Sequence, residues 1–190
     1  YDMTRTHDEV TGKLSGETDF NGNKSILVVD KRGFESCRIE GIATAASGET
    51  PSAPRRVRTI WDDNRPLPLQ RTVYRPAAPG SVPPANIGCN DEGFWTAVLE
   101  TTWTYMDGKL RTQVVRDKLN TAARTTTWTY YGDDEQVDPP VLWGLVRTVT
   151  GPTAQALTTY DYYTEDDPGG RWRRGDLQSL GQRTAGAAEL

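Results

Sequence analysis

A strict alternation of side chains over residues 95–105 limits what this part of the chain can form. An α-helix repeats every 3.6 residues and cannot keep every second side chain on one side, whereas a β-strand repeats every two. The alternation therefore predicts a strand with one row of residues on a single face of a sheet. That row is Trp95, Ala97, Leu99, Thr101, Trp103 and Tyr105.

A turn and a returning strand follow this first strand. The dipeptide Asp107-Gly108 favours the positive φ angles of a tight hairpin turn. After it, Leu110, Thr112 and Val114 alternate with more polar residues. Residues 95–115 are therefore predicted to form an antiparallel β-hairpin.

The same two-strand pattern recurs along the chain. Thr-Thr-Trp-Thr-Tyr at 101–105 returns at 126–130, and a related Leu-Thr-Thr-Tyr-Asp-Tyr stands at 157–162. The returning strand at 110–114 has a copy at 145–149 and a looser one at 69–73. A unit that recurs with loop insertions is typical of a repeat array, in which neighbouring units complete each other's core. The chain is therefore predicted to be all-β and built from antiparallel hairpin repeats.

Composition agrees with this prediction and excludes several classes of protein. The 190 residues include 25 Thr and 17 aromatics, which favour strands, and 18 Gly and 12 Pro, which mark turns. A net charge of -4 argues against a dedicated nucleic-acid binder. No apolar run reaches the ~20 residues of a membrane span, and no signal peptide is visible at the start. Since residue 1 is Tyr, we expect the chain to be a section of a longer protein.

The strand pattern extends to about residue 165 and then stops. We expect a β-repeat region over residues 1–165 and a weakly structured tail over 166–190, where Gly and Ala are frequent. Within the repeat region, Gly, Pro, Ser and Ala predict loops at about 43–55 and 75–90.

From the residues that could carry chemistry, we expect no enzymatic activity, no cofactor and no metal site. Cys37 and Cys89 lie 52 residues apart outside any CxxC motif, and we expect two unlinked thiols, with a single bridge as the open alternative. His7, the one histidine, stands in a polar stretch away from both cysteines. The acidic groups are interpreted as hydrated turn residues: Asp62-Asp63, Asp133-Asp134-Glu135, Asp138 and Glu165-Asp166-Asp167.

Several short motifs resemble YD repeats, the building blocks of the rearrangement-hotspot (Rhs) family. They are Thr-Thr-Tyr-Asp-Tyr at 158–162, Thr-Asp-Phe-Asn-Gly-Asn at 18–23 and Val-Asp-Lys-Arg-Gly at 29–33, where Val29 replaces the signature Tyr. Residues 55–73 resemble the segment that links repeats, and the likeness covers most of residues 10–163. The residues assigned to the repeat signature are Trp103, Tyr105, Trp128, Tyr130, Tyr160, Asp161, Tyr162, Asn21, Gly22 and Gly33.

This resemblance implies a section of a spiralling β-sheet shell that encapsulates a C-terminal toxin domain and helps to deliver it. The implied partners are the remaining repeats of the parent shell, the toxin cargo and a secretion or injection machinery, with no nucleic acid and no membrane span. The implied location is secreted or delivered at the cell surface of a bacterium.

The aromatic residues leave a second function open. Trp95, Trp103, Trp128, Tyr130, Tyr160 and Tyr162 are in phase with the repeat, and we expect them to stack across neighbouring strands inside the wall. If one row were exposed instead, it would form a platform for sugar rings. The chain would then be a secreted β-module that binds carbohydrate or a cell surface.

Overall fold

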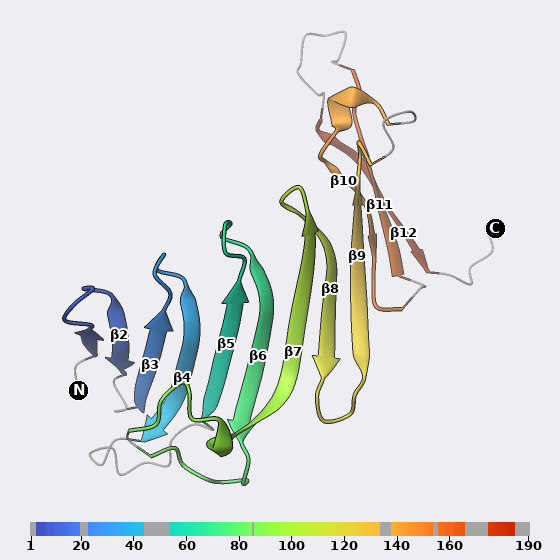
Figure 1. Ribbon diagram of the computed structural model, residues 1–190. Helices are drawn as coiled ribbons and strands as arrows, with labels where there is room; N and C mark the ends of the chain where they lie inside the picture. The colour runs from blue at the N-terminus through green and yellow to red at the C-terminus, as the bar shows by residue number, and fades with distance from the viewer. Residues whose placement is uncertain are drawn as a thin grey trace. The chain divides into compact units, whose positions relative to one another are not determined.

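The computed structural model describes residues 3–19, 23–43, 54–84, 86–133, 138–153, 156–165 and 175–184. Over these residues the chain forms a 12-stranded sheet whose strands follow one another in chain order (Figure 1). The prediction of an all-β fold of antiparallel hairpins is confirmed. The strands are β1 (Thr4–His7), β2 (Leu14–Thr18), β3 (Asn23–Val29), β4 (Glu35–Ala43), β5 (Arg55–Trp61), β6 (Pro68–Pro76), β7 (Trp95–Met106), β8 (Lys109–Asp117), β9 (Ala123–Tyr130), β10 (Val146–Thr150), β11 (Ala156–Tyr162) and β12 (Leu177–Thr184), with short 3-10 helices η1 (Glu92–Phe94) and η2 (Pro140–Leu142).

The chain divides into two compact units. The first comprises residues 1–102 and 115–122, and the second comprises residues 103–114 and 123–190. Among the described residues, no helix is long and apolar enough to cross a bilayer.

The predicted hairpin at 95–115 is present. β7 ends at Met106 and β8 begins at Lys109, so the connection has two residues. Asp107 and Gly108 have φ angles of 53° and 79°, as a tight hairpin turn of this kind requires.

A bulge in β4 places two isoleucines on the same face although they are three residues apart. Ile39 pairs with Ile26 and Ile42 pairs with Lys24, so Glu40 and Gly41 lie between the two pairs. Since Ile26 and Lys24 are two residues apart on β3, their partners share a face, and both isoleucines are fully buried. Gly41 has a φ of 73°, which glycine adopts without steric cost.

A second bulge divides the aromatic row that the alternation in β7 predicted. Tyr74 pairs with Ala97, while the preceding Val73 pairs with Leu99, so one residue of β7 has no partner between them. Adjacent residues of β6 point to opposite faces, and Ala97 and Leu99 therefore do as well. The prediction that all six residues share one face is wrong, because an unpaired residue reverses the alternation.

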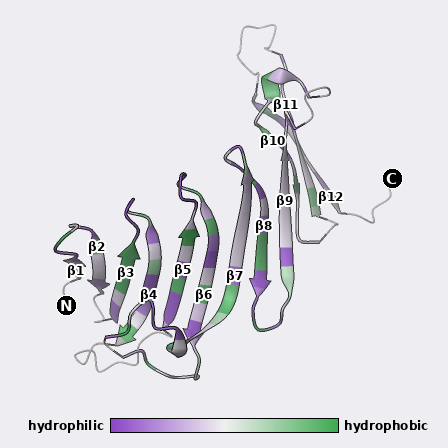
Figure 2. Ribbon diagram, viewed as in Figure 1, coloured by the Kyte–Doolittle hydropathy of each residue, from purple (hydrophilic) through white to green (hydrophobic). Residues whose placement is uncertain are grey.

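The core of the first unit lies between the sheet and the loop over residues 77–94. Its buried side chains come from β4, from this loop and from the start of β7, whereas Figure 2 shows polar and apolar residues mixed along the strands themselves. The predicted loop at about 75–90 is therefore part of the core. The cluster is Cys37, Ile39, Ile42, Ile87, Cys89 and Trp95, with Ile26, Tyr74 and Phe94 packed against it.

In the second unit, the predicted tail contains a strand. β12 pairs with β11 from Ala156 opposite Thr184 to Tyr162 opposite Leu177. Leu177 and Leu180 are about half exposed, so the strand depends on its backbone ladder more than on burial. The weak structure expected for 166–190 is therefore wrong for residues 177–184, whose few apolar residues conceal the strand in the sequence.

Candidate functional site

A buried arginine joins the loop to the sheet. The side chain of Arg56 on β5 is 0% exposed, and its guanidinium carbon lies 4.1 Å from the centre of the Tyr74 ring and 5.7 Å from that of Trp95. Its Nη1 donates to the carbonyl oxygens of Cys89 and Asp91 at 3.1 and 3.5 Å. A buried cation is costly without partners, and here two rings and the loop backbone supply them.

One carboxylate of the loop adds charge compensation at the rim. Glu92 Oε2 accepts a hydrogen bond from Arg56 Nη2 at 3.4 Å, and its Oε1 accepts one from Arg58 Nη1 at 2.7 Å. The Glu92 side chain is 65% exposed, so water screens both ion pairs. The backbone carbonyls are therefore the better-shielded partners of Arg56.

A disulfide bond fastens the same loop to β4. Cys37 and Cys89 are bridged, with their Cα atoms 6.2 Å apart. The expectation of two unlinked thiols is wrong. Their separation of 52 residues conceals the contact, because it depends on the loop returning across β5 to reach β4.

An aspartate recurs at the end of a strand and organises the turn after it. Its carboxylate accepts hydrogen bonds from the backbone N–H two residues further on and from a second N–H three or four residues on. Its own N–H donates to a carbonyl beyond the turn. We refer to this arrangement as the aspartate turn, and it is formed by Asp8, Asp30, Asp62 and Asp117.

The hydrogen bonds lower the pKa of three of these carboxyls. For Asp8 the main cause is the hydroxyl and backbone N–H of Thr11. For Asp117 it is the side-chain amide of Asn120. Desolvation raises the pKa of Asp30, but the N–H of Phe34 and the bonds from Arg32 outweigh it, and the net shift is downward. The three turns are therefore stabilised most when these groups are ionised.

Neighbouring turns are also bound to each other. Arg32 Nη1 donates to the carbonyl of Asp62 at 2.5 Å, which joins the β3–β4 turn to the β5–β6 turn. Beside these two turns, the ring centres of Phe34 and Trp61 lie 5.0 Å apart. Gly33, a predicted signature residue, has a φ of 95° in the first of these turns.

The predicted signature residues Asn21 and Gly22 lie outside the described residues. On either side of them, the carboxylate of Asp19 accepts hydrogen bonds from the backbone N–H and side-chain amide of Asn23 at 2.9 and 3.0 Å. These bonds connect the ends of β2 and β3.

Most of the predicted signature aromatics are half-buried. One of them, Tyr162, forms a ring pair with Tyr131, in which the ring centres are 5.9 Å apart and the planes are nearly perpendicular. The others lie on three strands: Trp103 and Tyr105 on β7, Trp128 and Tyr130 on β9, and Tyr160 on β11. Asp161, also assigned to the signature, accepts a hydrogen bond from Ser179 Oγ of β12 at 2.9 Å.

Among the signature residues that the structure describes, Tyr130 is the most buried, at 7% exposed. Its hydroxyl donates to the carbonyl of Leu110 at 2.8 Å. The guanidinium carbon of Arg111 lies 5.0 Å from its ring centre, and Asp133 holds Arg111 through two hydrogen bonds. Burial raises the pKa of the Tyr130 hydroxyl, and the bond to Arg111 lowers that of the Asp133 carboxyl.

One predicted hydrated turn residue is buried instead. Asp138 is 4% exposed, and its carboxylate accepts hydrogen bonds from the N–H of Gly132 at 2.9 Å and from Arg147 Nη1 at 3.0 Å. The sequence conceals this role because Arg147 belongs to the next strand, nine residues away. Asp134, Glu135, Asp166 and Asp167 lie outside the described residues.

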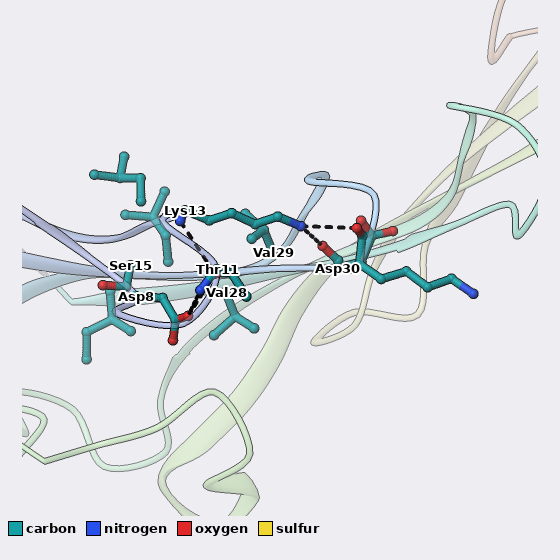
Figure 3. A pocket seen from close by; sticks show the side chains of 11 residues that line it. Asp8, Thr11, Lys13, Ser15, Val28, Val29 and Asp30 are labelled. Atoms are coloured by element: carbon teal, nitrogen blue, oxygen red, sulfur yellow. Dashed lines mark hydrogen bonds between the residues drawn. The ribbon is translucent and has the colours of Figure 1, made fainter.

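A cavity of about 520 Å³ lies beside β2 and β3 (Figure 3). The ammonium of Lys13 donates to the carbonyls of Asp30 and Lys31 at 2.8 and 3.1 Å, and the carboxylate of Asp8 is held by Thr11. The Lys13 bonds join the β1–β2 turn to the β3–β4 turn, whereas the Asp8–Thr11 bonds lie within the first of these turns. Among the described residues, no three His, Cys, Asp or Glu side chains are grouped to hold a metal ion, and His7 is exposed on β1.

Comparison with known proteins gives little similarity. No protein-family model matches the chain, and no curated protein matches it. A porin-like protein from Bacteroides uniformis is 14% identical, with 96% of this chain and 74% of that chain covered at a TM-score of 0.46. A chain of the TcdB2-TccC3-Cdc42 structure is 13% identical, with 84% of this chain and 13% of that chain covered at a TM-score of 0.20. At these values neither similarity identifies a fold family or a function.

Proposed function

We propose that this chain is a non-enzymatic wall segment of an Rhs/YD-repeat protein shell. In this proposal its hairpins enclose a toxin domain, and the parent shell helps to deliver that domain from a bacterium to a target. The partners would be the adjoining repeats, the cargo and the delivery machinery.

The observation that carries the proposal is the recurrence of one turn along the sheet. Four hairpin connections use an aspartate turn, and adjacent turns are bound together by Lys13 and by Arg32. Strands in unbroken chain order let such an array extend by adding further hairpins. The arginines and aspartates described above are held by hydrogen bonds or ion pairs, which suits a structural role better than catalysis.

A protease-protection experiment on the parent reading frame tests this proposal. The protein encoded around these residues would be purified and digested, and the survival of its C-terminal domain would be compared with that domain expressed alone. A shell predicts at least about tenfold slower cleavage of the enclosed domain, since proteolysis requires an opened state. Equal rates, or a parent protein without further hairpins, would contradict the proposal.

A glycan array and tryptophan-fluorescence quenching test the carbohydrate-binding alternative on this chain directly. Trp103 and Trp128 are half-buried, so their rings are partly open to a ligand. A wall segment predicts no sugar-dependent quenching. Quenching that is lost in Trp103→Ala or Trp128→Ala would favour the carbohydrate-binding module instead.

A further inference from the structure

The loop over residues 77–94 covers one face of the sheet without joining its ladder. Among the described residues, its backbone hydrogen bonds stay within the loop or close its base. Examples are Ala77 N–H to Phe94 O at 2.9 Å and Ile87 N–H to Pro84 O at 2.9 Å. The loop is therefore held down by side chains and by the disulfide.

Three kinds of contact hold this loop. Ile87 is 3% exposed in the core cluster, Arg56 donates to the loop carbonyls, and Cys89 is bonded to Cys37. Of these, the disulfide is the one contact that a change of redox conditions breaks directly.

We propose that the Cys37–Cys89 bridge is a redox latch for this loop. Its reduction by a dithiol would release residues 78–93 from the sheet while the strands stay paired. The released state would expose the Arg56 guanidinium and the apolar side chains of Ile39 and Ile42, which the oxidised protein keeps buried.

The chemistry is a thiol–disulfide exchange that balances with one dithiol. A thiolate of the reductant attacks Sγ of Cys89, the more exposed cysteine at 9% against 4%. Cys37 leaves as a thiolate and takes up a proton. The second thiol of the reductant then displaces Cys89 from the mixed disulfide. The reductant is oxidised to a disulfide, and both cysteines become thiols.

Two features favour local opening over general unfolding. The ladders β3–β4, β4–β5 and β5–β6 contain no residue of the loop, so their hydrogen bonds survive its departure. Water would also hydrate the released Arg56 guanidinium, which compensates in part for the loss of its bonds to Cys89 O and Asp91 O. Burial of Ile87 and Trp95 opposes opening of the loop. The disulfide opposes it further, because it lowers the conformational entropy that the loop would gain on release.

Hydrogen exchange measured by mass spectrometry, with and without dithiothreitol, tests the latch on the 190-residue chain. Thiol titration would verify that both cysteines are reduced. We expect amides within 78–93 to exchange at least about tenfold faster in the reduced protein. Amides of β3, β6, β9 and β11 should change by less than about twofold, because those ladders remain closed.

A variant separates the latch from a direct effect of the reductant. Cys37→Ser combined with Cys89→Ser should show the fast loop exchange without dithiothreitol and no further change with it. Three results would overturn the proposal. These are unchanged loop exchange in protein with two titrated thiols, faster exchange in every strand, and resistance of the folded protein's bridge to dithiothreitol.

Discussion

Arg56 and Tyr74 face each other across β5 and β6, with the guanidinium carbon 4.1 Å from the centre of the ring. The pair lies beneath the loop over 77–94, where a hydrophobic residue would be the usual occupant. Arg56 therefore combines the roles of core residue and anchor, because its aliphatic stem packs and its nitrogens bind the loop backbone.

Replacing this arginine should destabilise the first unit. Arg56→Ala removes the donor to Cys89 O and Asp91 O and leaves a cavity between Tyr74 and Trp95. We expect the free energy of unfolding to fall by about 2–5 kcal/mol in urea denaturation, as for other truncations of a large buried side chain. Arg71→Ala on the neighbouring strand β6 is the control, because Arg71 is exposed and its loss should change stability by less than about 0.5 kcal/mol. Equal effects of the two substitutions would disprove the anchoring role.

Any side chain at position 41, in the β4 bulge, should lower the stability of the fold. Its φ of 73° is strained for an L-residue, so Gly41→Ala should lower the free energy of unfolding by about 1–2 kcal/mol. Gly93→Ala is the matched control, because a Cβ there would meet no atom within 4 Å. Thermal or urea denaturation of both variants measures the difference in their free energies of unfolding. If Gly41→Ala were as stable as Gly93→Ala, the bulge would not need glycine.

The aspartate turns should make the protein sensitive to acid. Asp8, Asp30 and Asp117 have folded-state pKa values below the ordinary 3.8, so their contribution is complete well above pH 3.8. As pH falls below that value, the unfolded chain takes up protons first, and stability declines until the folded carboxyls are protonated too.

Substitution by asparagine isolates this effect. The side-chain oxygen of Asn still accepts the turn hydrogen bonds but does not titrate, so an Asp8→Asn, Asp30→Asn, Asp117→Asn variant should lose less stability between pH 5 and pH 2. Urea midpoints across that range measure the difference, and Asp63→Asn, an exposed residue beside Asp62, is the control. A triple variant with the pH profile of the parent chain would show that the turns contribute nothing to acid sensitivity.

In the second unit, the Tyr130 hydroxyl should contribute measurably to stability. Tyr130→Phe keeps the ring beside Arg111 but removes the hydrogen bond to Leu110 O, at an expected cost of about 0.5–1.5 kcal/mol. Tyr160→Phe is the control. The backbone carbonyl of Tyr160 accepts a hydrogen bond from the Tyr131 hydroxyl, and the substitution keeps that carbonyl. A similar loss in both variants would remove the special role of the Tyr130 hydroxyl.

Local signals predicted much of this fold. The period-two row and the Asp107-Gly108 turn located the β7–β8 hairpin, because strand alternation and positive φ are properties of a few consecutive residues. The Val-Asp-x-x-Gly motif at 29–33 likewise marked the turn where Asp30 caps the backbone. The pattern did not reveal the same turn at Asp8 and Asp117, where the preceding residues are His7 and Arg116.

Features that depend on distant residues were not predictable. The bulge between Ala97 and Leu99 is defined by how β7 pairs with β6. The sequence of β7 alone does not show which of its residues lacks a partner on β6. The bridge and the burial of Arg56 both depend on the path of the loop over 77–94. Nothing in the sequence distinguishes Arg56 from its exposed neighbour Arg55.

In the first unit, the two longest connections between strands lie at the same end of the sheet, where the β2–β3 link at 19–22 is short. The links β1–β2, β3–β4 and β5–β6 span 8–13, 30–34 and 62–67, whereas the β4–β5 and β6–β7 links at the other end span 44–54 and 77–94. Because strands run in antiparallel order, an insertion at the second end leaves every strand pair in register. A long connection is therefore compatible with the strand pairing there, and the loop bonded through Cys89 contributes directly to the core.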